Sequence, residues 1–264
     1  MTWAHPRVGQ ALANPTGMSH PINGLESSIG PLYEGFLSFK RTILPTHHSL
    51  YQELAAGQSP RALFITCSDS RVVPELIFQA RPGDLFVCRN AGNLVPPHGD
   101  PAGGVAATIE YAVGVLNVPN VIICGHTGCG AIDALVHPEK VSSLPSVAAW
   151  LRYAEAARQV VSEAQHHHSK EDLAAELERE NVVAQLEHLK THPAVASRIA
   201  RGNLHIFGWI YDIREGGISA YDAASGGFAP LDERFVTATP RPRLQLVKRH
   251  KNNDGQSPCL SRSA

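Results

Sequence analysis

The chain has 264 residues, of which 43% are hydrophobic and 18% are charged, and its formal net charge is −1. This length and balance predict a globular protein with a sizeable core and exclude wholesale disorder. The near-neutral charge gives no electrostatic basis for binding nucleic acid or an anionic membrane. No apolar run approaches the roughly 18 residues of a membrane span. Five cysteines are too few for a disulfide framework, so we expect a reduced, cytoplasmic protein.

The N-terminal part is expected to be a loose extension followed by a helical arm. Residues 1–22 show no sustained periodicity, and MTWAHPRVGQ at the start lacks the apolar centre of a secretory signal. From residue 23 to 58 apolar side chains such as Leu32 and Phe36 recur at helical spacing. Pro45 interrupts this series, which favours two helices over one.

Strand-like and helix-like segments alternate in the middle of the chain. The apolar runs 61–66, 83–88 and 120–124 are typical of strands, whereas residues 103–116 carry apolar side chains at helical spacing. Strands separated by helix-length segments indicate βαβ units. The predicted fold class is therefore α/β, with a mostly parallel central β-sheet flanked by helices.

Helices dominate the next part of the chain, and a strand pair follows them. Residues 144–199 show a helical pattern, in which Ser169 and Asp172 have the spacing of a helix start. Residues 203–213 predict a strand, and residues 216–222 predict its partner across a tight turn.

We expect one domain between two less structured ends. The boundaries are a loose extension at 1–22, a single domain at 23–239 and a tail at 240–264. The tail is strongly basic, and a flexible, solvated segment is the simplest interpretation of it. Docking of a partner is the alternative.

Two short stretches contain the residues suited to chemistry, CSDSR at 67–71 and GHTGCG at 125–130. Each follows a predicted strand, and the carboxyl ends of parallel strands converge on one crevice. If the chain stays extended after Cys67, the side chains of Asp69 and Arg71 point to the same face as its thiol. His126 and Cys129 are three residues apart and can also project together.

Cys67, His126 and Cys129 together form a Cys₂His set suited to a tetrahedral Zn²⁺. No further Cys or His has suitable local spacing, so Asp69 or a water molecule remains for the fourth position. A fourth position open to water is typical of catalytic zinc.

Other interpretations explain these stretches less well. Isolated cysteines in apolar surroundings are often core residues, but here both stretches also carry Gly and polar side chains. A phosphatase loop would need its Arg six positions after the Cys, whereas Arg71 is four after Cys67. The glycines have the wrong order for a dinucleotide turn. A Cys-His nucleophilic pair gives the second cysteine no role.

The sequence resembles the β-class carbonic anhydrases, in their plant-like and cyanobacterial-like branch. The resemblance runs from about Leu32 to Leu231. It rests on CSDSR, GHTGCGA and further stretches of the same order and spacing, namely RNAGN at 89–93, the GG…A-x-x-E-Y segment at 103–111, ENVVAQLEHLKTHPAV at 180–195 and GWIYDI at 208–213.

The resemblance implies one Zn²⁺ per subunit, bound by Cys67, His126 and Cys129. It also implies that zinc-bound hydroxide attacks CO₂ to give bicarbonate and a proton. Asp69 either pairs with Arg71 or moves onto the metal, and a carboxylate held by the guanidinium fork is stabilised away from the metal. We expect the paired form near neutral pH.

The resemblance further implies homodimers or higher homo-oligomers with active sites at the subunit interface. Gln58 matches a residue that reaches the substrate from the neighbouring subunit. The remaining positions match residues that line the CO₂ pocket, although the usual Val is Ala at 91: Phe86, Ala91, Tyr111 and Gly130. Core packing alone is the alternative for Phe86 and Tyr111.

A bicarbonate-inhibited branch of the family places a Trp three residues before the first cysteine, together with an Arg and a Tyr. Arg89 and Tyr211 match here, but the Trp is replaced by Phe64. Phe has no indole N–H to hold the anion. We therefore predict weak or absent inhibition by bicarbonate.

Three functions remain open at this stage. Hydration of CO₂ is the leading one. The alternatives are hydrolysis of CS₂ or COS on the same scaffold, and a non-catalytic scaffold or regulatory homologue. The complete set of expected metal ligands with Asp69 and Arg71 argues against the last. Similarity to carboxysomal members gives only a weak indication of that location.

Overall fold

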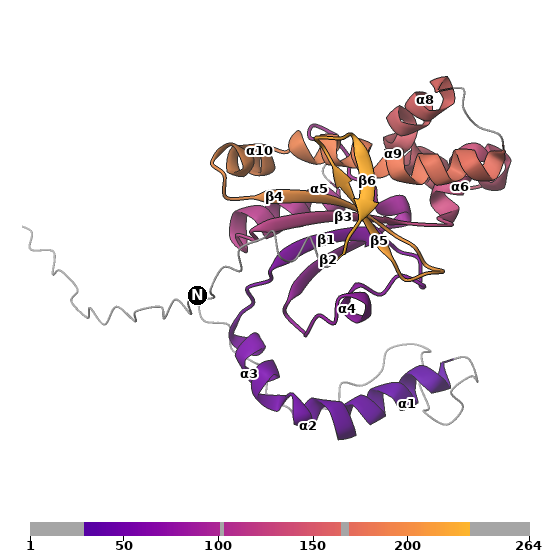
Figure 1. The fold of residues 1–264 in the computed structure, drawn as a ribbon. Coiled ribbons are helices and arrows are strands. Elements are labelled where there is room, and N and C mark those ends of the chain that lie inside the picture. The colour runs from indigo at the N-terminus through magenta and orange to yellow at the C-terminus, as the bar shows by residue number, and fades with distance from the viewer. Residues whose placement is uncertain (1–28, 101–102, 165–168, 233–264) are drawn as a thin grey trace, which may run out of the picture.

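The structure is a computed structural model that describes residues 29–100, 103–164 and 169–232. The predicted extension at 1–22 and tail at 240–264 lie outside these residues. The described part begins with the predicted helical arm, which projects away from the rest of the molecule (Figure 1) and buries none of its side chains within this chain. Its segments are α1 (Gly30–Ser38), a π-helical turn (Phe39–Ile43), α2 (Leu44–Thr46) and α3 (His48–Ala56).

The arm bends close to the predicted interruption. Pro45 lies in α2, which directly continues the π-helical turn, and its ring leaves one position of this helical run without an N–H donor. The backbone leaves the helical region at His47, with φ −116° and ψ 15°, before α3 begins.

A six-stranded sheet with the order β2-β1-β3-β4-β5-β6 forms the centre of the molecule (Figure 1). Its strands are β1 (Ala62–Cys67), β2 (Leu85–Asn90), β3 (Asn120–His126), β4 (His205–Tyr211), β5 (Ile218–Asp222) and β6 (Gly227–Pro230). The first four are mutually parallel, and β5 and β6 are antiparallel. The predicted mostly parallel α/β sheet is confirmed, including the turn back from β4 to β5. Strand β6, a four-residue edge strand that ends in Pro230, was not predicted.

Most helices after β1 lie in the segments 103–116 and 144–199 that the sequence indicated as helical. The two short helices α4 and α6 were not predicted. The set is α4 (Pro74–Ile77), α5 (Gly104–Glu110), α6 (Gly130–Val136), α7 (Pro145–Leu151), α8 (Glu155–Glu163), α9 (Lys170–Lys190) and α10 (Pro193–Ala200). Ser169 caps α9 as expected, because its side chain accepts a hydrogen bond from the Asp172 N–H. No helix in the described ranges is long and apolar enough to cross a membrane.

The two faces of the sheet differ in what covers them. Leu63 and Ile65 point to the face covered by α5, α9 and α10 (Figure 1), where they join the largest hydrophobic cluster. Phe64 points to the opposite face and packs against Phe78 and Trp209. The alternation follows from the two-residue period of a strand.

Helix α9 lies unusually close to the sheet beside β3 and β4. A Cβ at Gly208 would be 2.8 Å from the Val182 Cγ1, and a Cβ at Gly125 would be 2.9 Å from its Cγ2. Contacts this short do not occur between real side chains, so these two glycines permit the approach of α9. The helix is thereby brought next to the carboxyl end of β3, where the predicted metal ligands begin.

Candidate metal centre

The two predicted ligand stretches meet because their strands are parallel neighbours. Cys67 is the last residue of β1 and His126 is the last residue of β3, and these strands pair directly. After His126 the chain turns through Gly128, whose φ of +66° favours glycine. The turn brings Cys129 to the position that precedes α6. All three side chains therefore lie at the same edge of the sheet.

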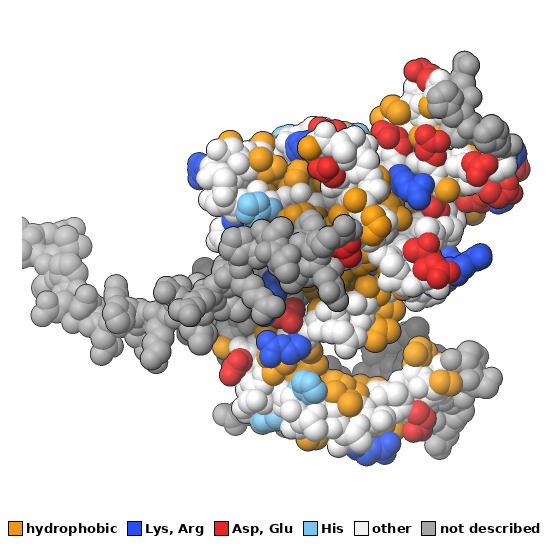
Figure 2. All heavy atoms as spheres, in the orientation of Figure 1, with side chains coloured by type: hydrophobic (Ala, Val, Ile, Leu, Met, Phe, Trp, Pro, Cys, Tyr) orange, Lys and Arg blue, Asp and Glu red, His pale blue; other side chains and the backbone are white. Residues whose placement is uncertain are grey.

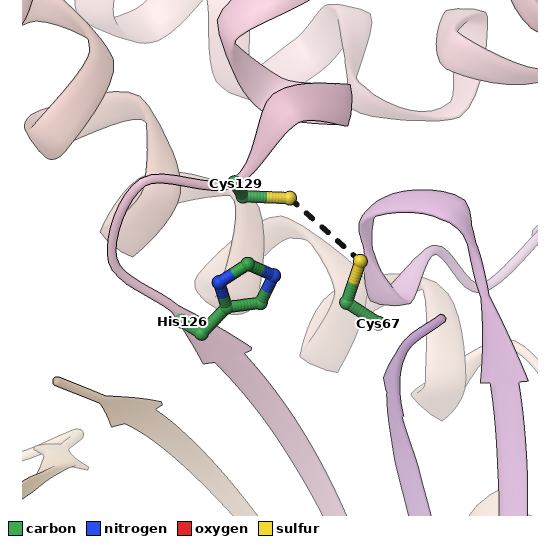
Figure 3. Close-up of side chains that lie close together, drawn as sticks. All are labelled: Cys67, His126 and Cys129. Carbon is green, nitrogen blue, oxygen red and sulfur yellow. Dashed lines mark hydrogen bonds between the residues drawn. The ribbon is translucent and has the colours of Figure 1, made fainter. Parts of the chain in front are cut away.

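The three side chains form a compact and buried donor set (Figure 3). Their ligand atoms all lie within 4.8 Å of one another, and the two Sγ atoms are 3.9 Å apart. None of the three residues is more than 5% exposed. In zinc enzymes, two cysteines and one histidine are one of the known sets of three protein ligands that leave a fourth position for water.

The orientation of His126 supports metal binding. Its Nδ1 lies 3.0 Å from the Thr127 carbonyl oxygen, so in the neutral ring Nδ1–H donates and Nε2 keeps its lone pair. That Nε2 is buried and has no hydrogen-bond partner among the described residues. A buried acceptor without a partner is costly, whereas a cation at this position would satisfy it. The residues present therefore fit Zn²⁺.

The two thiols differ in acidity because of their contact. The hydrogen bond with Cys129 lowers the pKa of the Cys67 thiol well below its ordinary value, although burial opposes this. The same hydrogen bond, together with burial, raises the pKa of Cys129. Two thiolates so close together repel each other without a cation, and a divalent metal would stabilise both.

Asp69 and Arg71 form the predicted pair, but not on an extended chain. The backbone turns after Asp69, with the Val72 N–H donating to the Asp69 carbonyl oxygen at 3.1 Å. The guanidinium then donates from Nε to Asp69 Oδ1 at 2.9 Å and from Nη2 to Oδ2 at 2.7 Å. The chain therefore does not stay extended beyond Cys67, and a turn makes the contact instead. These hydrogen bonds hold the pKa of Asp69 far below its usual range.

This carboxylate lies beside the donor set. Asp69 Oδ2 is 3.9 Å from His126 Nε2, which is too far for a hydrogen bond. Arg71 also donates to the Gly128 carbonyl oxygen at 2.9 Å, so it bridges the two ligand-bearing loops. The carboxylate is held next to the metal position by the arginine.

Arg89 stabilises the loop that follows Cys67. Its guanidinium donates to three backbone carbonyl oxygens, those of Cys67 at 3.1 Å, Asp69 at 2.6 Å and Val72 at 2.6 Å. From the sequence, Arg89 was noted only as a match to a bicarbonate-inhibited branch. Its hydrogen bonds to the backbone were not predicted, because carbonyl oxygens that come together in a turn leave no signal in the residue pattern.

The predicted pocket residues fall into two groups within one chain, with Phe86 and Tyr111 in one and Ala91 and Gly130 adjacent in sequence to residues of the metal centre in the other. Phe86 and Tyr111 contact each other with ring centroids 5.9 Å apart, and Tyr111 is 46% exposed. Ala91 directly follows β2, and its carbonyl oxygen accepts from Trp150 Nε1 at 2.8 Å. Gly130 begins α6 immediately after the ligand Cys129.

Gln58 lies in the exposed segment between α3 and β1. Among the described residues, no hydrogen bond, ion pair or ring contact joins the side chains of Gln58, Phe86 or Tyr111 to the metal ligands. The substrate roles of these residues therefore stay predictions.

The class of protein follows from this geometry: an α/β metalloprotein with a buried Cys₂His zinc site at the carboxyl edge of a parallel sheet. The family follows from comparison with known proteins, in which the family model for carbonic anhydrase matches residues 62–218. The chain belongs to the β-class carbonic anhydrase family.

Curated relatives are similar over most of their length. A carbonic anhydrase of Pseudomonas aeruginosa is 50% identical over 216 residues, which cover 82% of this chain and 94% of that protein. Carbonic anhydrase 1 of Escherichia coli O157:H7 is 50% identical over 200 residues, which cover 76% of this chain and 91% of the relative.

Solved structures agree with this membership. The β-carbonic anhydrase CcaA is 44% identical, has a TM-score of 0.75 and aligns over 77% of this chain and all of its own. One of two tetrameric β-carbonic anhydrases of Sordaria macrospora is 28% identical, with a TM-score of 0.67 and coverage of 74% of this chain and 97% of the other.

Proposed function

We propose that this protein catalyses the reversible hydration of CO₂ to bicarbonate and a proton, with one Zn²⁺ per subunit. The observation that carries the proposal is the buried donor set, in which one ligand atom each of Cys67, His126 and Cys129 lie within 4.8 Å of one another and His126 Nε2 has no hydrogen-bond partner among the described residues. The relatives that match most of the chain are named carbonic anhydrases. When bound, Zn²⁺ supplies the Lewis acidity that makes hydroxide available near neutral pH.

Asp69 and Arg71 are proposed to organise the reactants beside the metal. The two hydrogen bonds from Arg71 keep Asp69 ionised, so its Oδ2 is an acceptor at every physiological pH. An acceptor held at a fixed place can take a hydrogen bond from the attacking water and so orient its lone pair towards CO₂. Arg71 also keeps the carboxylate from becoming a competing metal ligand, because its release would cost both hydrogen bonds.

We infer that the functional unit is a homodimer or a higher homo-oligomer. The arm exposes large apolar side chains, with Leu32 70% and Phe36 53% accessible. The sheet face that carries Phe64 and Trp209 is hollowed by a cavity of about 530 Å³. Figure 2 shows hydrophobic atoms on the arm and on the part of the body that faces it. A second copy would cover such surfaces.

In this assembly Gln58 would reach the active site of the neighbouring subunit. One amide donor there can orient the CO₂ oxygen that becomes negative, and the apolar side chains of Phe86, Ala91 and Tyr111 suit an apolar gas. Gly130, the residue after Cys129, would line the substrate pocket beside the metal. A cytoplasmic location remains a prediction from the residue composition.

The test combines metal analysis with kinetics on the purified protein. We expect one zinc per subunit, rapid CO₂ hydration in a stopped-flow assay and loss of both after removal of the metal by a chelator. CS₂ hydrolysis, measured in parallel, separates the second candidate substrate. Zinc-loaded protein without CO₂ hydration would overturn the proposal and favour either CS₂ or COS hydrolysis or a non-catalytic role.

A further inference from the structure

Helix α9 carries a stripe of polar side chains that points into the protein. Glu178 is 6% exposed, Asn181 is 1% exposed and Gln185 is fully buried. Spacings of three and four residues place all three on one face of the helix. Buried polar side chains destabilise a fold unless hydrogen bonds satisfy them. The hydrogen-bond partners of these three side chains therefore indicate what role the side chains have in the interior of the protein.

Glu178 contacts the loop that bears the second cysteine. Its Oε1 accepts a hydrogen bond at 2.8 Å from the backbone N–H of Cys129. That N–H belongs to a residue preceding α6, where no partner within the helix exists. The carboxylate thus fixes the backbone from which the Cys129 thiol projects.

Asn181 contacts the loop after β2, which lies against the first cysteine. Its Nδ2 donates to the Gly92 carbonyl oxygen at 3.1 Å. The N–H of the same Gly92 is directed at the Cys67 Sγ, 3.4 Å away. Amide hydrogens directed at a thiolate stabilise its charge, so the placement of Gly92 bears on the sulfur itself.

Gln185 fixes the orientation of Asn181. Its Nε2 donates to Asn181 Oδ1 at 3.0 Å, which leaves the Asn181 amide nitrogen to donate to Gly92. Its Oε1 accepts from the Val95 N–H at 2.7 Å, a few residues further along the same loop. Helix α9 therefore contacts the turn that ends at Cys129 and the loop whose Gly92 N–H points at Cys67, although the two cysteines lie 62 positions apart.

We propose that Glu178 and Asn181 are positioning residues that place the two sulfurs for metal binding, with Gln185 orienting Asn181. The inference rests on the zinc centre of the proposed function. Neither residue belongs to the donor set of Cys67, His126 and Cys129. Each acts through the backbone, Glu178 on Cys129 and Asn181 on Gly92 and hence on Cys67.

The test measures zinc affinity by competition with a chromophoric chelator, and the thiolate-to-metal absorption of the cobalt-substituted protein. Glu178→Leu and Asn181→Leu remove the polar groups at similar volume. Glu178→Gln keeps one acceptor oxygen for the Cys129 N–H. Leu189→Ala is the matched control, because Leu189 is fully buried on the same helix but lies outside the polar stripe.

We expect the two leucine variants to bind zinc about 10- to 100-fold more weakly and to show an altered cobalt absorption band. Glu178→Gln should lie between the wild type and Glu178→Leu. Leu189→Ala should lower the melting temperature and leave both metal readouts unchanged. If a leucine variant fails to fold, Glu178→Gln and Asn181→Asp carry the test, with the same direction expected.

Two results would overturn the inference. One is wild-type zinc affinity in both polar-stripe variants. The other is a loss of affinity that follows the drop in melting temperature equally in Leu189→Ala, which would mean a structural role alone. A wild-type protein that binds no zinc would instead contradict the proposed function, so the two failures can be told apart.

Discussion

Arg71 holds Asp69 by two hydrogen bonds from one guanidinium group, at 2.9 Å from Nε and 2.7 Å from Nη2. The same Nη2 donates to the Gly128 carbonyl oxygen at 2.9 Å. The arginine therefore connects the carboxylate to the turn between His126 and Cys129. Loss of this side chain would both release Asp69 and loosen the second loop.

Replacement of Arg71 by Leu is expected to lower kcat/KM for CO₂ hydration by about 10- to 100-fold, the usual cost of removing a residue that orients a metal site. Arg71→Lys should recover little, because an ammonium group cannot donate in the fork geometry that matches a carboxylate. Stopped-flow hydration and zinc analysis on the same preparations check this.

The matched control is Arg158→Leu, which removes an exposed arginine paired with Glu155 on α8. Its activity should equal that of the wild type, because an exposed ion pair contributes little. Unchanged hydration in Arg71→Leu would contradict the role given to the pair.

Replacement of Cys67 by Ser is expected to abolish zinc binding and CO₂ hydration together. Ser offers a poorly acidic hydroxyl in place of a thiol whose pKa the Cys129 contact lowers. Cys88→Ala is the control, because Cys88 is also buried but its pKa is raised by burial, as expected of an inert core thiol. Metal analysis should give about one zinc for the control, and full zinc content in Cys67→Ser would refute the ligand assignment.

The fold and the metal ligands could be predicted from sequence because their signals are local. Residues 120–124 form an apolar run that predicts a buried strand without knowledge of its neighbours. Parallel pairing of β1 and β3 then brings the ends of the two strands together. The Cys₂His donor set follows from residue chemistry. The resemblance of CSDSR and GHTGCGA to one family then assigned the substrate.

The supports of the site could not be predicted in the same way. Arg89 and Glu178 act on backbone groups, and which backbone groups lie within reach depends on turns that form only in the folded chain. The turn after Cys67 could not be foreseen for the same reason, since it is closed by the hydrogen bond from the Val72 N–H to the Asp69 carbonyl oxygen. The four-residue β6 lacked enough alternating residues to be recognised as a strand.

Inhibition by bicarbonate is expected to be weak and without cooperativity. Phe64 is 1% exposed and packs against Phe78 and Trp209, and it has no N–H to offer an anion. Arg89 is already engaged with three backbone carbonyl oxygens. Initial rates measured with increasing bicarbonate at constant ionic strength should show a shallow hyperbolic decrease, and a steep sigmoidal loss at millimolar concentrations would contradict this expectation.

The stability of the protein should decrease as the pH falls below neutrality, in part because of His192. This histidine is 4% exposed, and its Nε2 lies 3.0 Å from the Pro96 carbonyl oxygen. Burial lowers its pKa, and the nearby His98 and His188 act in the same direction. The unfolded state, with a pKa of about 6.5, then binds a proton that the folded state resists.

The stabilising contribution of neutral His192 is therefore complete above about pH 6.5 and declines as the pH falls from there towards the lowered pKa of the folded state. One such group changes the free energy of unfolding by at most about 1.4 kcal/mol per pH unit. Urea unfolding of the wild type and of His192→Gln at pH 7.5 and 5.5 measures this term, because Gln can donate to the Pro96 carbonyl without titrating. The wild type should lose more stability than the variant between the two pH values, and equal losses would show that His192 does not contribute to the acid sensitivity.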